Sequence, residues 1–125
     1  MKFVYIAGPY TGKTHDHCSY WEIDANISRS LEAMQQLAQA GLGAFSPHGH
    51  SAHFEVIAPD VPATYWYELD LHFLEACDGI LMLPGWENSK GSLKEKARAE
   101  ELGMPVFYSV GGAIAYFLIA PGRSQ

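Results

Sequence analysis

The sequence predicts an α/β fold in which one domain, residues 1–125, is built on a doubly wound parallel sheet of the Rossmann-like or flavodoxin-like kind. Short apolar runs typical of buried strands alternate with longer segments whose apolar residues recur at helical spacing. This alternation implies right-handed β-α-β crossovers, and 125 residues are enough to bury one core. We therefore expect four to five strands in the order 2-1-3-4-(5).

Glycine and proline residues mark the ends of the expected elements. Gly41 follows the first helical segment as a stop signal, and Pro62 precedes the second. The expected helices are Ile23–Ala40, Ala63–Ala76 and Ser92–Leu102, and the expected strands are Phe3–Ala7, Leu42–Ser46, Ile80–Leu83 and Val106–Val110. Residues 48–62 are predicted to form a long loop, and periodicity leaves 111–120 open between a fifth strand and a short helix.

Composition and charge exclude several classes of function. A net charge of -6 argues against a nucleic-acid polymer as partner, because such binding needs a basic surface, but a single nucleotide remains possible. Cys18 and Cys77 show neither metal-ligand spacing nor a disulfide framework, so we expect a cytoplasmic protein, and we expect no cofactor. The apolar stretches near both ends are too short for a signal peptide or a membrane span, which predicts a soluble protein without a membrane partner.

The segment AGPYTGKT, Ala7–Thr14, fits a relaxed phosphate-loop pattern. In a true phosphate loop the Lys-Ser/Thr pair opens a helix directly, whereas helical periodicity here begins only near Ile23. Pro9 also removes a backbone donor that such a loop uses. A glycine-rich turn after the first strand is the better interpretation, and a phosphotransferase is the weaker alternative.

Glu95 allows two interpretations. With Ser92 it forms the pattern of a helix capping box, which is an ordinary structural feature. It also follows a long loop at the carboxyl edge of the expected sheet, where ligands bind in α/β folds, and that loop carries Trp86. We expect Lys94, Lys96 and the helix N-terminus to keep the carboxylate ionised, as a nucleophile requires.

Asp70 and Tyr5 are expected near the same edge. Asp70 should lie roughly 10 Å up its helix from the far end, beside an apolar face formed by Leu69, Phe73 and Ala76. A solvated helix charge is the alternative. Tyr5 lies near the end of the first strand, and a buried ring there needs a partner for its hydroxyl. A carboxylate across the crevice would be such a partner.

Three histidines, His48, His50 and His53, form H-x-H-x2-H after the second expected strand. Three imidazoles could bind zinc, yet the sequence offers no obvious fourth ligand, so no metal site is predicted. Polar loop residues are the default interpretation, with His48 as a candidate for substrate contact.

Three stretches together resemble the nucleoside 2-deoxyribosyltransferase superfamily, which also contains the 2′-deoxynucleoside 5′-phosphate N-hydrolases. They are VYIAGPY, the D-x7-D around Asp70 and Asp78, and GSLKEKARAEELGMPV. The last, with its preceding loop, is similar to a largely uncharacterised bacterial and phage group within the superfamily. The resemblance covers most of the chain.

The resemblance implies cleavage of the N-glycosidic bond of a (deoxy)nucleoside or nucleoside 5′-monophosphate, by hydrolysis or by transfer to another base. Glu95 would be the nucleophile, Asp70 the acid that protonates the leaving base, and Tyr5 the group that positions Glu95. Ser89 would contact a 5′-phosphate. The expected substrate-binding residues are Gly8, Tyr10, His48, Trp86, Ser89, Gly91 and Ser92. The family resemblance also implies a homodimer or higher homo-oligomer.

Two departures from the family pattern support a second hypothesis. Ala97 stands where these enzymes often have glycine, and Lys94 and Lys96 flank the acid with unusual charge. A nucleotide-binding sensor module that keeps the pocket without turnover is therefore the alternative to an enzyme.

Overall fold

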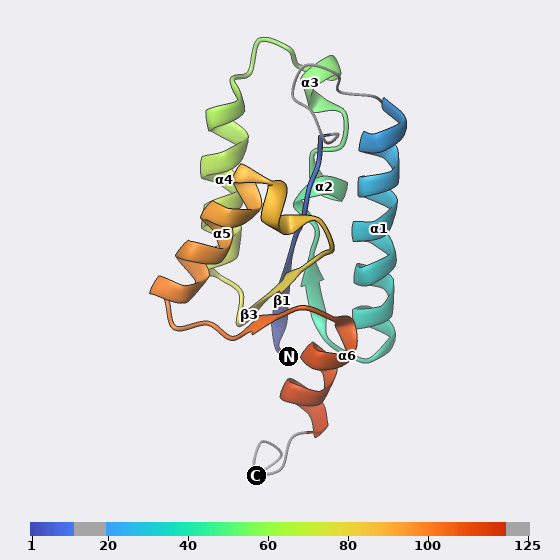
Figure 1. Ribbon diagram of the computed structural model, residues 1–125, viewed down its shortest axis with the longest axis vertical. Helices are drawn as coiled ribbons and strands as arrows, with labels where there is room; N and C mark the ends of the chain where they lie inside the picture. Colours follow the sequence, from blue (N-terminus) through green and yellow to red (C-terminus); the bar gives the residue numbers. More distant parts are fainter. Residues whose placement is uncertain (12–19, 120–125) are drawn as a thin grey trace.

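The computed structural model describes residues 1–11 and 20–119, and its centre is a four-stranded parallel sheet in the order β2-β1-β3-β4 (Figure 1). The strands are β1 (Phe3–Ala7), β2 (Gly43–Phe45), β3 (Gly79–Met82) and β4 (Val106–Phe107). In β1, Tyr5 pairs with Phe45 of β2 and Ile80 of β3. The predicted fold class and strand order are confirmed.

The helices differ from the prediction mainly at their ends and in the loops. They are α1 (Tyr20–Gln39), α2 (Pro47–His50), α3 (Phe54–Ile57), α4 (Ala63–Glu75), the 3-10 turn η1 (Trp86–Asn88), α5 (Lys90–Glu101), α6 (Val110–Ile114) and the π-helical turn η2 (Ala115–Ile119). The stretch predicted as one long loop thus contains α2 and α3. The C-terminal segment forms a short helix, not a fifth strand, because it turns back to pack against the sheet with Ala113 buried.

The two faces of the sheet are covered by different helices, as Figure 1 shows. On one face, Val4 and Ile6 of β1 pack in a core that includes residues of α1 and α6. On the other, Tyr5 and Ala7 pack in a core that includes residues of α4 and α5. Alternate residues of a strand point to opposite faces, so β1 directs Tyr5 between the sheet and the α4–α5 pair.

Just after β1, the backbone at Gly8 packs closely against Leu83, which follows β3. A Cβ atom added at Gly8 would lie 2.9 Å from the Cβ atom of Leu83, so only glycine fits without a shift. The later part of the phosphate-loop pattern, including Lys13, lies outside the described residues. Within 1–11 and 20–119, no helix combines the length and the apolar character needed to cross a membrane.

Candidate active site

Helix α5 begins at a different serine from the one predicted. Ser89 is the N-cap, and its Oγ accepts a hydrogen bond of 3.2 Å from the backbone N–H of Ser92. The predicted capping box of Ser92 and Glu95 is therefore wrong. Glu95 lies almost two turns inside the helix and cannot reach back to the N-cap residue. Ser92 and Glu95 instead share the buried face of α5 with Ala99.

Glu95 meets Tyr5 in the interior. The Tyr5 hydroxyl donates a hydrogen bond to Glu95 Oε2, and the two residues are 0% and 8% exposed. The predicted need of a buried tyrosine hydroxyl for a partner is thus met by this carboxyl group. The contact joins β1 to α5 and fixes one oxygen of Glu95, which leaves the other without a hydrogen bond to this tyrosine.

Asp70 joins this pair from α4. The inward side of α4 carries Tyr67, Asp70 and Leu74, whereas Phe73 is 37% exposed and Ala76 is exposed. The predicted apolar face was therefore wrong, and Asp70 lies on the inward side itself. Its charge is close enough to Glu95 and to Tyr5 to shift the pKa of both.

Several buried polar atoms beside this cluster are unsatisfied. In the described part of the chain, three such side-chain atoms have no hydrogen-bond partner, and all belong to α4 and α5: Trp66 Nε1, Asp70 Oδ1 and Ser92 Oγ. Native proteins rarely leave such atoms unpaired, so each of them requires an explanation. A ligand that supplies the missing partners is one.

Burial dominates the electrostatics of the two carboxyl groups. It raises the pKa of Glu95 to about 8; the hydrogen bond from Tyr5 acts in the opposite direction, and the charge of Asp70 raises the pKa further. Burial likewise raises the pKa of Asp70 to about 6. Between these values the unliganded pair holds one proton.

The flanking lysines do not act as predicted. Lys94 Nζ lies 5.2 Å from the centre of the Tyr67 ring, which faces it from α4. Lys96 Nζ donates to Glu100 at 3.1 Å and lies 5.6 Å from the centre of the Trp86 ring. The expectation that they keep Glu95 ionised is wrong, because the raised pKa of Glu95 shows that burial outweighs them.

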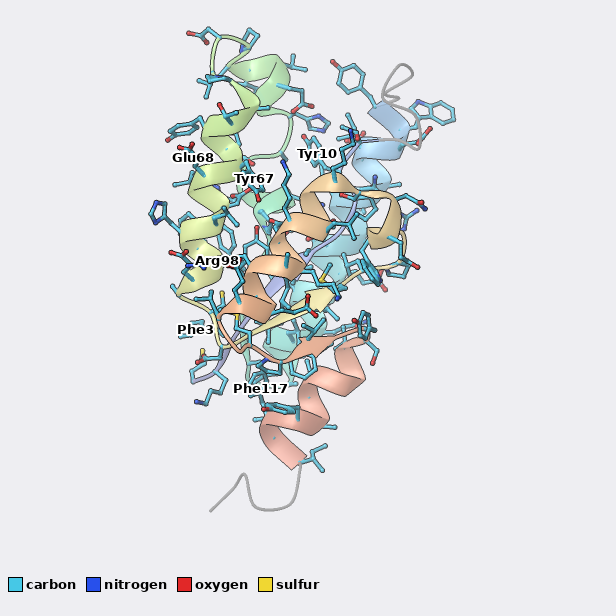
Figure 2. The ribbon with its side chains drawn as sticks, turned by 60° about the vertical axis from the view of Figure 1, so that its left-hand side comes forward. Phe3, Tyr10, Tyr67, Glu68, Arg98 and Phe117 are labelled. Atoms are coloured by element: carbon cyan, nitrogen blue, oxygen red, sulfur yellow. The ribbon has the colours of Figure 1, made fainter. Side chains whose placement is uncertain are left out.

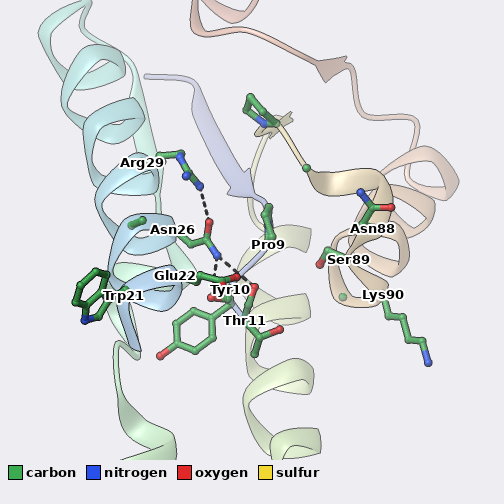
Figure 3. Close-up of a pocket in the computed structure, with 14 residues that line it drawn as sticks. Pro9, Tyr10, Thr11, Trp21, Glu22, Asn26, Arg29, Asn88, Ser89 and Lys90 are labelled. Carbon is green, nitrogen blue, oxygen red and sulfur yellow. Dashed lines mark hydrogen bonds between the residues drawn. The ribbon is translucent and has the colours of Figure 1, made fainter. Parts of the chain in front are cut away.

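A cleft of about 960 Å³ opens beside the start of α5 (Figure 3). In the close-up, Ser89 and Lys90 lie on one side and Tyr10 and Thr11 on the other, with α1 forming a further wall. Gly91 also lines the cleft, and a Cβ atom added there would meet nothing within 4 Å. The residues that line the cleft do not include Glu95 or Asp70.

Two other predicted residues hold the chain segment after β1. His48 Nε2 donates to the carbonyl oxygens of Gly8 and Pro9 at 2.9 and 3.1 Å, and burial lowers the pKa of His48. The Tyr10 hydroxyl donates to Glu55 Oε2 at 2.9 Å and accepts from the backbone N–H of His53 at 2.8 Å. These contacts shape one wall of the cleft.

The other predicted residues make contacts that do not involve Asp70 or Glu95 in the described structure. His53 Nε2 lies 2.7 Å from Asp24 Oδ1, and the His50 ring packs 5.5 Å from the ring of Phe45. The ring of Trp86 lies 5.7 Å from that of Tyr108 and within 6 Å of Lys96.

Sequence reasoning missed Tyr67 near the cluster. Burial is the main cause that raises the pKa of Tyr67, and the charge of Glu95 raises it further. It lies three residues before Asp70, which is the spacing of neighbours on one helix face, so this signal was present in the sequence. Figure 2 shows Tyr67 on α4, on the side that faces α5.

Residues 2–108 match the sequence profile of a family described as "Domain of unknown function (DUF4406)". The chain belongs to this family. A comparison with curated proteins found no match.

Solved structures of three other proteins share the fold. A 2-deoxyribosyltransferase from Bacillus psychrosaccharolyticus has 20% identity and a TM-score of 0.57 over 83% of this chain and 69% of its own. A 2-desoxiribosyltransferase from Leishmania mexicana has 19% identity and a TM-score of 0.58 over 85% of this chain. This chain covers 62% of the Leishmania protein, less than two thirds of its length. BlsM has 20% identity and a TM-score of 0.59 over 98% of this chain and 74% of its own. The resemblance to deoxyribosyltransferases predicted from the sequence is confirmed at the level of the fold.

Proposed function

We propose that this protein cleaves the N-glycosidic bond of a nucleoside or nucleoside 5′-monophosphate through a covalent glycosyl intermediate on Glu95. The observation that carries the proposal is the buried cluster of Tyr5, Glu95 and Asp70, in which Tyr5 holds Glu95 and burial raises the pKa of both carboxyl groups. Glycosidases use such a pair, with one carboxylate as nucleophile and one carboxyl as acid. The deoxyribosyltransferase fold of the chain agrees with this chemistry.

In the first step a Glu95 carboxylate oxygen attacks C1′ as the bond from C1′ to the base nitrogen breaks. The electron pair of that bond leaves with the base, which takes its proton from Asp70. Tyr5 keeps its hydrogen bond to the other Glu95 oxygen and so holds the attacking group in place. Water then attacks C1′ in a hydrolase, and a ring nitrogen of a second base does so in a transferase. Asp70, now a carboxylate, takes the proton that the attacking group loses, and the electron pair of the broken C1′–Glu95 bond returns to Glu95.

Substrate binding must move the shared proton. In the unliganded protein the higher pKa belongs to Glu95, whereas the reaction needs Glu95 ionised and Asp70 protonated. Positive charge that develops at C1′ stabilises an anion at Glu95. Asp70 Oδ1 has no donor to stabilise its own anion, which favours the proton there. The charge of the transition state thus sets the roles of the two acids.

The cleft beside the start of α5 suits the 5′ end of the substrate. Ser89 and Gly91 line it, and the first N–H groups of α5 point toward this end of the helix. The helix dipole there favours an anion such as a phosphate. We assign the 5′-phosphate to this cleft.

The reaction is tested with a panel of nucleosides and 5′-monophosphates and chromatography for free base, with and without an acceptor base. We expect wild-type protein to release base and Glu95→Gln to release none. Glu100→Gln, which removes a 56% exposed carboxylate from the same helix, is the matched control and should remain active. Intact-mass analysis after rapid acid quenching should find the glycosyl adduct in wild type. If Glu95→Gln releases base as fast as wild type, the proposal is wrong.

The raised pKa of Glu95 favours a second candidate, a nucleotide-binding module without turnover. A protonated Glu95 is no nucleophile, and a site that never moves this proton would only bind. Calorimetry with a nucleotide that binds tightly and stays intact for hours would support this candidate.

A further inference from the structure

Ser92 is a buried serine whose hydroxyl has nothing to bind. Its side chain is 1% exposed, and Oγ is one of the three unpartnered polar atoms on α4 and α5. An unpaired buried hydroxyl lowers stability relative to alanine, which also favours helix more strongly than serine. Neither the helix cap nor the packing of α5 needs this oxygen, because Ser89 is the cap.

The position of Ser92 relates it to the nucleophile. It precedes Glu95 by three residues on the buried face of α5, and side chains at this spacing are neighbours roughly 5–6 Å apart between Cβ atoms. A sugar whose C1′ is bonded to Glu95 therefore lies beside Ser92. Asp70 Oδ1 is a second unpartnered atom at the same cluster, and a bound ligand would supply a partner to each of the two.

The stereochemistry of the reaction selects the sugar group that Ser92 meets. In a β-nucleoside the base leaves from one face of the sugar, so the nucleophile attacks C1′ from the opposite, α face. The 2′-hydroxyl of ribose projects from this α face at the carbon next to C1′. The 3′-hydroxyl shares the face but is one carbon farther away.

We propose that Ser92 determines sugar specificity by hydrogen bonding to the 2′-hydroxyl, and that the substrates are ribonucleosides or ribonucleotides. The inference rests on the proposed function and names its substrate class. A site built to hydrogen-bond a hydroxyl discriminates against the analogue that lacks it, because its own polar group is then left unpaired. In the unliganded protein Ser92 Oγ is in that unpaired state.

The test compares Ser92→Ala with wild type on ribo-, 2′-deoxyribo- and 3′-deoxyribonucleosides and their 5′-monophosphates that carry the same base. The measured quantity is the ratio of kcat/KM between variant and wild type for each sugar, so the intrinsic reactivity of each glycosidic bond cancels. We expect a loss of about tenfold or more on the ribo and 3′-deoxy substrates and less than about twofold on the 2′-deoxy substrate.

Stability provides a second readout with a matched control. Ser30 is equally buried, but its Oγ lies 2.5 Å from Ser46 Oγ, so Ser30→Ala removes a hydrogen bond that exists. We expect Ser30→Ala to lower the melting temperature and Ser92→Ala to leave it equal or higher. Calorimetry in a Glu95→Gln background, with and without Ser92→Ala, repeats the sugar comparison for binding alone.

The outcomes separate this inference from the proposed function. Wild-type protein that cleaves no substrate contradicts the proposed function. Wild-type activity with an equal loss on all three sugars in Ser92→Ala overturns the role of Ser92 and leaves the function intact. A loss that spares only the 3′-deoxy substrate overturns the assignment to the 2′-hydroxyl.

Discussion

Glutamine in place of Glu95 should make the folded protein more stable at alkaline pH. The side chain is 8% exposed, and burial raises its pKa from 4.5 to about 8. The unfolded chain therefore releases the proton near pH 4.5, whereas the folded chain holds it until about pH 8. Stability is fully present below the lower value and is lost as pH rises through the higher one.

The expected size follows from the two pKa values. Each pH unit between them corresponds to about 1.4 kcal/mol, so ionised Glu95 lowers the free energy of unfolding by about 5 kcal/mol at pH 9. Glutamine has nearly the same shape, can accept the hydrogen bond from Tyr5 and carries no charge. For a domain of this size the variant should melt roughly 15–20 °C higher than wild type at pH 9 and near the wild-type temperature at pH 5.

Urea unfolding followed by circular dichroism from pH 5 to pH 9 measures the effect as a free energy at each pH. Glu100→Gln, which removes an exposed carboxylate that pairs with Lys96, should keep the wild-type pH dependence. If Glu95→Gln loses stability with pH as steeply as wild type, then Glu95 is not the group whose ionisation opposes folding. The electrostatic account of the site would then fail.

Four further predictions concern activity. The pH profile of kcat/KM should be bell-shaped with limbs near 6 and 8, because activity needs one proton on the Asp70–Glu95 pair; a profile flat across this range would contradict the shared proton. Asp70→Asn should lower kcat by about 10²–10⁴-fold on natural nucleosides and much less on a sugar with a nitrophenolate leaving group, in steady-state assays. Tyr5→Phe should move the alkaline limb to higher pH, because the hydrogen bond from Tyr5 lowers the pKa of Glu95; an unmoved limb would argue against that bond. Gly91→Ala should raise the free energy of unfolding by about 0.5 kcal/mol, because alanine favours helix more than glycine and the new Cβ atom would meet nothing within 4 Å. The same change should raise KM for 5′-monophosphates more than KM for nucleosides.

The fold was predictable because its signals are local. Alternating apolar runs and helical periods identify the strands and the longer helices without tertiary information. The helix start was not predictable in the same way, since Ser89 and Ser92 both fit an N-cap and only the path of the chain out of η1 selects Ser89. The short helices α2 and α3 have too few residues to show a period.

The proximity of Tyr5 and Glu95 was predictable, but the protonation of Glu95 was not. Tyr5, Asp70 and Glu95 were expected at one edge, and the structure joins Tyr5 and Glu95 directly. The sequence does not indicate which side of α4 faces inward, because both sides are equally apolar. One side carries Leu69 and Phe73, and the other carries Leu71 and Leu74. The protonation of Glu95 depends on burial under α4, which sequence neighbours such as Lys94 do not report.

The first turns of α5 face both the cleft and the protein interior. Ser89 and Gly91 line the cleft, while Ser92 and Glu95 lie on the buried face toward Tyr5. Successive helix residues are turned by 100°, so a rigid backbone fixes the distance between a group held in the cleft and the carbon attacked by Glu95. Binding energy from the 5′ end can therefore be used to position C1′, in which case a substrate without that end loses kcat as well as affinity. A nucleoside and its 5′-monophosphate should then differ in both constants, which separates a site built on one helix from two independent pockets.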